Sequence, residues 1–177
     1  MTKAVFLDRD GTINVDRGFV HRIQDFEFIP GAVDALKSLY HAGFELFIVT
    51  NQSGIALGYY KEEDVLKVHE YLFNELFSNG VCLSGILYCQ HHPSVMPCNC
   101  RKPAPGMLES LISTFNVDVS RSYMVGDKFS DVEAGRRVKL RSILLDSTGC
   151  LGRTDSIADY CCRNLSEASD FILGKVI

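Results

Sequence analysis

Residues 4–12, Ala-Val-Phe-Leu-Asp-Arg-Asp-Gly-Thr, decide how this chain folds. The apolar run Ala4–Leu7 predicts a short buried strand, and two carboxylates follow it directly, at Asp8 and Asp10. Gly11 can adopt the turn in which backbone N–H groups point at a ligand. The motif alone is equally compatible with a solvated turn or a helix N-cap, so its meaning depends on the rest of the chain.

Short apolar runs alternate with segments of helical period through most of the sequence. This alternation predicts an α/β fold, a doubly wound parallel sheet covered on both faces by helices. No linker or repeat divides the chain, so we expect a single domain over residues 1–177. Further strands are expected at 44–49, 85–88, 123–125 and 142–145, and helices at about 30–42, 62–79, 106–115 and 131–138.

The segment 62–79 has a helical period, and Gly80 ends it. We expect its apolar residues to form one broad stripe that faces the core. They are Val65, Leu66, Val68, Leu72, Phe73, Leu76 and Phe77.

Charge and composition exclude several classes of protein. The net charge of −4 argues against a nucleic-acid partner, because no excess of basic residues is available to pair with phosphates. No apolar run approaches the ~20 residues of a membrane-spanning helix, and the N-terminus does not resemble a signal peptide. We therefore expect a cytoplasmic protein that does not bind membranes and acts on a small molecule. Separately from these observations, we expect a monomer.

Polar residues stand where the predicted strands end. Asp8, Thr50, the loop 89–103 and Asp127 each follow a strand directly. Because ligands of parallel α/β sheets bind at the carboxyl ends of the strands, we expect these four segments to meet in one crevice. Mg²⁺ takes a few carboxylate oxygens and completes its shell with water and phosphate, so Asp8 and Asp127 are expected to share one ion.

Donors for phosphate oxygens are expected in the same crevice. Thr50 and Asn51 offer a hydroxyl group and amide groups, and Lys102 offers a positive charge. Any one of these pieces is common in proteins. Their occurrence together, each after a strand, favours a phosphate site.

The loop 89–100 has the ligand composition of a tetrahedral zinc site. Four protein ligands leave no open coordination position, so the predicted zinc is structural. The alternative, a loop of unligated cysteines, is less favoured because two close ligand pairs rarely coincide in a reducing compartment. Metal binding would fix the direction of Arg101 and Lys102, which follow the last ligand. The predicted ligands are Cys89, His91, Cys98 and Cys100.

These segments together resemble the four motifs of the haloacid dehalogenase superfamily of phosphatases. The matching positions are 8–12, Thr50, Lys102 and 126–131. The resemblance implies a Rossmann-like domain in which Asp8 attacks phosphorus to form an aspartyl phosphate, and Asp10 is the general acid and base.

The same resemblance implies the other roles in the site. Thr50 and Lys102 would stabilise charge on the transferred phosphoryl group, and Asp8, Asp10 and Asp127 would bind Mg²⁺. Asp131 would orient Lys102 or a metal-bound water. The intervals between motifs have no room for the cap domain that many members carry, so we expect a capless, open site whose substrate is recognised by loops.

Several stretches, among them LDRDGTINVDRGFVHR, VTNQSGIALG and CNCRKPAPGML, resemble the bacterial D-glycero-D-manno-heptose 1,7-bisphosphate 7-phosphatases over roughly residues 5–135. This resemblance implies hydrolysis of the 7-phosphate of a sugar bisphosphate, with Arg101 binding the phosphate that is retained. The implied substrate-binding residues are Asp16, Arg17, Gly18, Phe19, Asn51, Gln52, Ser53, Arg101 and Lys128.

Two other functions fit parts of the pattern. Histidinol-phosphate phosphatases share the zinc loop, but they differ at the positions of Ser53 and Lys128 and lack the stretch 16–19. A noncatalytic protein that binds phosphorylated ligands would be expected to lose Asp8, Asp10 or Asp127, and all three are present.

Overall fold

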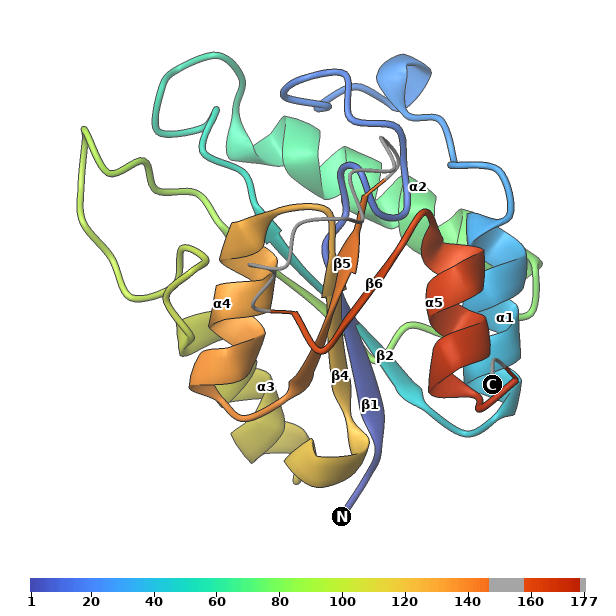
Figure 1. The fold of residues 1–177 in the computed structure, drawn as a ribbon. Helices are drawn as coiled ribbons and strands as arrows, with labels where there is room; N and C mark the ends of the chain where they lie inside the picture. The colour runs from blue at the N-terminus through green and yellow to red at the C-terminus, as the bar shows by residue number, and fades with distance from the viewer. Residues whose placement is uncertain (147–157, 176–177) are drawn as a thin grey trace.

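The computed structural model describes residues 1–146 and 158–175. Within them, six strands form one parallel sheet in the order β3-β2-β1-β4-β5-β6 (Figure 1). The first strand lies near the centre and pairs on one side with β2 and on the other with β4, so the chain winds outward in both directions. The strands are β1 (Ala4–Leu7), β2 (Glu45–Asn51), β3 (Gly85–Cys89), β4 (Tyr123–Gly126), β5 (Arg141–Leu145) and β6 (Tyr160–Cys162).

Helices cover both faces of the sheet, with α1, α2 and α5 on one face and α3 and α4 on the other (Figure 1). The two hydrophobic clusters follow the alternation of side chains along each strand. In β1, Val5 and Leu7 pack with the first group of helices, and Ala4 and Phe6 with the second. The helices are α1 (Ala32–His41), α2 (Glu62–Ser78), α3 (Gly106–Phe115), α4 (Phe129–Arg137) and α5 (Leu165–Ile172), with 3₁₀ turns at Ile23–Asp25 and Val119–Arg121.

This architecture confirms the predicted doubly wound α/β fold. None of the helices in the described ranges combines the length and apolar character that a membrane span requires.

The prediction of one broad core-facing stripe on α2 was wrong in part. Its main row is buried, at Val65, Val68, Leu72 and Leu76. The residues beside that row are exposed, because a helix on the face of a sheet covers only one side of its surface. These exposed residues are Leu66, Phe73 and Phe77.

The strand β6 and the helix α5 were not predicted. The strand has only three residues and lies at the sheet edge, so its apolar run is too short to be recognised. The helix has a readable start, since the side chain of Asn164 accepts a hydrogen bond from the Glu167 N–H. Leu165, Ala168 and Ile172 then form its buried row.

Candidate active site

Three carboxylates meet at the carboxyl ends of β1 and β4. Asp8 follows β1, Asp127 follows β4, and Asp131 lies in the first turn of α4. Each offers one oxygen atom, and these three oxygens all lie within 4.8 Å of one another. Such proximity of like charges requires a compensating cation.

Two glycines make this close approach possible. Gly11 has a φ of +82°, and a Cβ atom there would collide with the carboxylate of Asp127. A Cβ atom on Gly126 would collide in the same way with Asp131. The motifs Asp-Arg-Asp-Gly and Gly-Asp-Lys therefore need glycine so that two strand ends can bring their carboxylates together.

Lys102 supplies one of the compensating charges. Its Nζ lies 2.7 Å from Asp131 Oδ1, 3.0 Å from Asp8 Oδ1 and 2.6 Å from the Val49 carbonyl oxygen. Burial alone would lower the pKa of Lys102, but the carboxylates of Asp131 and Asp8 raise it above the ordinary value. Lys102 is therefore a buried, permanently charged group beside Asp8.

Asn51 fixes the position of Lys102 through the backbone. Its side chain donates to the Lys102 carbonyl oxygen and accepts from the Lys102 N–H, both at 3.0 Å. Asn51 was predicted to bind substrate, and it lines the cleft. Both polar atoms of its side chain are nevertheless engaged by the backbone of Lys102.

Asp127 has the longest ion pair of the cluster, with Lys128 Nζ 3.7 Å from its Oδ2. Burial raises the pKa of Asp127 to about 7, Lys128 opposes this shift, and the carboxylates of Asp8 and Asp131 add to it. Among the described residues, its buried Oδ1 has no hydrogen-bond partner. A buried carboxylate oxygen without a partner, beside two further carboxylates, suits a hard divalent cation such as Mg²⁺.

Asp10 lies beside this cluster but its carboxylate is held by other groups. It accepts hydrogen bonds from Arg9, from Asn14 Nδ2 at 2.9 Å and from Gln52 Nε2 at 2.9 Å. Gln52 also donates to Thr50 Oγ1, at 3.0 Å. The predicted catalytic residues Asp10 and Thr50 are thus joined through one buried amide.

A cleft of about 470 Å³ opens over Asp8, Asp10, Thr50 and Lys102. Every predicted substrate-binding residue except Arg17 lines it. Arg17 instead forms an ion pair with Glu27 on the exposed surface, so the structure does not bring it to the site. The lining residues from that prediction are Asp16, Gly18, Phe19, Asn51, Gln52, Ser53, Arg101 and Lys128.

Lys128 and Asp16 face each other across the mouth of the cleft, with Lys128 Nζ 3.2 Å from Asp16 Oδ2. Burial would lower the pKa of Lys128, but Asp127, Asp8 and Asp16 raise it. A hydrogen bond from the Gly18 N–H holds the other oxygen of Asp16 at 2.9 Å. The loop after β1 is therefore tied to Lys128, the N-cap residue of α4.

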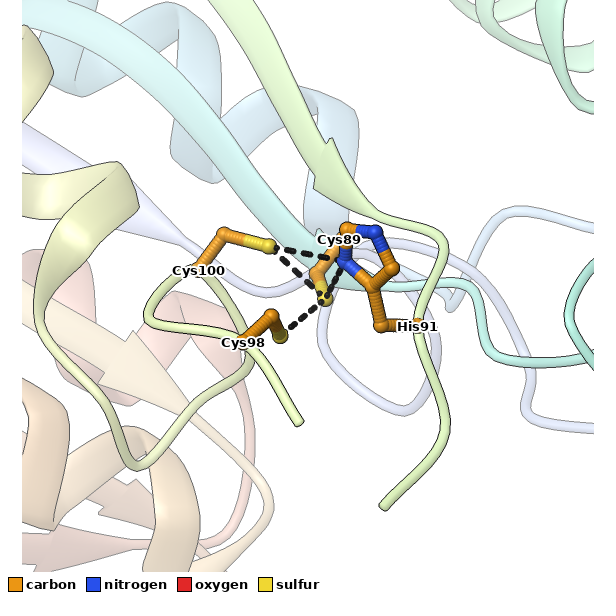
Figure 2. Close-up of side chains that lie close together, drawn as sticks. All are labelled: Cys89, His91, Cys98 and Cys100. Carbon is orange, nitrogen blue, oxygen red and sulfur yellow. Dashed lines mark hydrogen bonds between the residues drawn. The ribbon is translucent and has the colours of Figure 1, made fainter. Parts of the chain in front are cut away.

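The four predicted zinc ligands converge at the carboxyl end of β3 (Figure 2). His91 Nδ1 lies 3.2 Å from Cys100 Sγ, and Cys89 Sγ lies 3.1 Å from Cys100 Sγ and 3.5 Å from Cys98 Sγ. Each residue offers one ligand atom, all within 4.8 Å of one another, so this cluster can hold a metal ion. Arg101 follows it directly and donates to the His91 carbonyl oxygen at 3.3 Å.

Several residues of the site were not predicted from the sequence. Tyr60, Pro103 and Ser130 line the cleft, and Tyr60 donates to Gln52 Oε1 at 3.1 Å. The side chain of Arg9 is fully buried next to Asp10. An arginine between two aspartates gives no sign of burial in sequence, so only the three-dimensional arrangement identifies it.

Comparison with known proteins agrees with this geometry. A family model described as HAD-hydrolase-like matches residues 99–168. D-glycero-β-D-manno-heptose-1,7-bisphosphate 7-phosphatases from Pasteurella multocida and Haemophilus influenzae are 47% and 46% identical to this chain. The alignments cover 84% of both chains for the first and 90% of this chain and 91% of the relative for the second.

A solved structure is also similar. The D,D-heptose 1,7-bisphosphate phosphatase from B. bronchiseptica, crystallised with magnesium and phosphate, superposes with a TM-score of 0.88 at 28% identity. The match covers 99% of this chain and 100% of that one.

The parallel sheet, the carboxylates at its strand ends and these similarities define a haloacid dehalogenase-type phosphatase. The chain belongs to the D-glycero-β-D-manno-heptose-1,7-bisphosphate 7-phosphatase family.

Proposed function

We propose that this chain hydrolyses the 7-phosphate of D-glycero-β-D-manno-heptose 1,7-bisphosphate and releases heptose 1-phosphate. The observation that carries the proposal is that Asp8 lines a cleft together with Asp10 and with the buried Lys102, whose Nζ lies 3.0 Å from Asp8 Oδ1. The names of the curated relatives support the heptose substrate and its β-anomer. The product would serve synthesis of nucleotide-activated heptose.

The reaction requires two displacements at phosphorus. A carboxylate oxygen of Asp8 attacks, the bond from phosphorus to the sugar oxygen breaks, and Asp10 gives that oxygen a proton. Water then attacks the aspartyl phosphate and gives a proton to Asp10, which releases phosphate and restores Asp8. Thr50 and Lys102 line the cleft, and we assign them to the phosphoryl oxygens as donors.

Asp8, Asp127 and Asp131 form the carboxylate group that fits Mg²⁺. The bound ion would neutralise charge on the transferred phosphoryl group. Asp10 stays a predicted ligand, although its carboxylate already accepts hydrogen bonds from Arg9, Asn14 and Gln52. The crystallised B. bronchiseptica relative with magnesium and phosphate supports this choice of ion.

The retained 1-phosphate needs cations in the same cleft. Arg101 and Lys128 both line it and are the positive groups there besides Lys102, among the lining residues. We assign them to this phosphate. The cytoplasmic location, the monomeric state and the single domain over 1–177 stay predictions from the sequence.

The substrate assignment is tested by steady-state kcat/KM for both anomers of the heptose bisphosphate and for histidinol phosphate. We expect the β-heptose bisphosphate to be favoured over histidinol phosphate by at least about 10²-fold, because histidinol phosphate has no second phosphate to pair with Arg101 and Lys128. A preference for histidinol phosphate would overturn the substrate and leave the chemistry at Asp8 in place.

We also propose that the cluster at 89–100 binds structural zinc. Metal analysis is expected to find about one Zn²⁺ per chain, which survives mild chelation that removes Mg²⁺. Cys98→Ser should lose this zinc and lower activity, because the loop no longer fixes Arg101 and Lys102. Cys82→Ser, outside the cluster, is the matched control. Full activity without bound zinc would contradict the assignment.

A further inference from the structure

Arg9 is a charged side chain enclosed by the protein. Among the described residues, Arg9 has the largest side chain that is fully buried, with 0% of its surface exposed. A guanidinium stays protonated and has five N–H donors but no acceptor, so each buried donor needs an acceptor nearby. The groups that surround Arg9 therefore determine where it points.

Two of its three nitrogens, Nη2 and Nε, donate to Asp10. Arg9 Nη2 lies 2.9 Å from Asp10 Oδ2 and 3.0 Å from Oδ1, and Nε lies 3.3 Å from Oδ1. The same Nη2 donates to the Val20 carbonyl oxygen at 2.6 Å. The orientation of the Asp10 carboxylate is thus coupled to the orientation of the guanidinium.

The remaining nitrogen, Nη1, lies 3.2 Å from Nε2 of His69. Because Arg9 can only donate, His69 Nε2 has to accept, which requires a neutral ring with its proton on Nδ1. Burial, assisted by the charge of Arg9, lowers the pKa of His69 to about 3 and agrees with a neutral ring. His69 is 5% exposed, so water has little access to replace it.

His69 is itself held in place by the elements around it. It lies within α2, and its ring packs edge-on against Tyr88 of β3 with the centroids 5.4 Å apart. The Tyr88 hydroxyl donates to Glu62 Oε1 at 2.6 Å, which ties the strand to the first turn of the same helix.

We propose that His69 is a positioning residue for the phosphatase reaction, a neutral acceptor that orients Arg9 and thereby aims Asp10 at the leaving oxygen. It touches neither the cleft nor the three clustered carboxylates. This inference rests on the proposed role of Asp10 as general acid. Through His69, the helix α2 would influence proton transfer although it lies outside the phosphate site.

The test compares leaving groups. His69→Phe keeps an aromatic ring but removes the nitrogen that accepts from Arg9. The constant to compare is kcat/KM, because it reports the reaction steps up to departure of the alcohol. For a sugar phosphate, whose alkoxide needs a proton, kcat/KM should fall about tenfold. For p-nitrophenyl phosphate, whose leaving group needs little protonation, it should fall less than about twofold.

Two variants and one control separate the explanations. His69→Gln retains an acceptor and should restore most of the loss, whereas His41→Phe makes the same change on the exposed part of α1 and should have no effect. Asp10→Asn should show the same dependence on leaving group, more strongly. If it does not, the proposed role of Asp10 fails; if only His69→Phe lacks the dependence, this inference alone fails.

An equal loss for both substrates, or no rescue by His69→Gln, would also overturn the inference, since either would indicate a role in packing only. Should His69→Phe not fold, ¹⁵N NMR of the histidine-labelled wild type provides the second measurement. We expect the His69 ring to be neutral and protonated on Nδ1 at pH 7. A proton on Nε2 would exclude the contact with Arg9 as described.

Discussion

Asp8→Asn is expected to lower kcat by at least about 10³-fold, because the amide that replaces the proposed nucleophile cannot attack phosphorus. The change should not unfold the protein. Asp8 and Asp131 both raise the pKa of Asp127, so removing one charge relieves repulsion within the cluster. The measurements are phosphate release and the thermal unfolding midpoint.

The control for this variant is Asp34→Asn, the same substitution at an exposed position of α1. Rapid acid quench with ³²P-labelled substrate should trap a phosphorylated chain in the wild type and in Asp34→Asn, and none in Asp8→Asn. Retained turnover by Asp8→Asn would mean that the nucleophile is another group or a water molecule.

The strands and helices that carry the site were predictable because each apolar run ends in a recognisable polar motif. The expected helix at 106–115 matches α3 at both ends, and the expected strands at 44–49 and 123–125 differ from β2 and β4 by a residue or two at their ends. Beyond β5 the sequence has no such motif. There the edge strand β6 has only three residues, too few for a periodic pattern, whereas the helix α5 has a cap at Asn164 and a buried row that the prediction overlooked.

Within the site, the residues were predictable and their connections were not. Sequence spacing indicated that Asp8, Lys102 and Asp127 belong together. It did not indicate that Gln52 joins Asp10 to Thr50, or that Arg9 is buried. Those contacts depend on the direction of side chains from different elements. The same reason explains Arg17, which neighbours cleft residues in sequence but points to Glu27.

Lys102→Met should affect both activity and stability. Loss of the charge beside Asp8 is expected to lower kcat/KM by about 10²–10³-fold, since a buried donor to the phosphoryl group disappears. The free energy of unfolding should fall by about 3 kcal/mol, because Asp131 is fully buried and loses its cation at 2.7 Å. Lys37→Met, at an exposed position of α1, is the control.

This loss of stability should depend on pH in a defined direction. Burial already raises the pKa of Asp131, and Lys102 opposes that shift, so Lys102→Met raises this pKa further. A carboxyl group whose pKa is higher in the folded than in the unfolded state binds more protons when folded, so stability falls as pH rises from the unfolded pKa to the folded one. The difference in unfolding free energy between wild type and Lys102→Met should therefore be larger at pH 8 than at pH 5.

A second substitution tests whether the uncompensated charge is the cause. Asp131→Asn, introduced into Lys102→Met, replaces the buried carboxylate by an amide of the same shape. The double variant should recover much of the lost stability and most of its pH dependence, but none of the activity, because Asp8 still lacks its neighbouring cation. Equal destabilisation of the single and double variants at both pH values would show that Lys102 contributes through packing of its aliphatic chain. The charges of Asp8, Asp131 and Lys102 would then not be coupled in the folded protein.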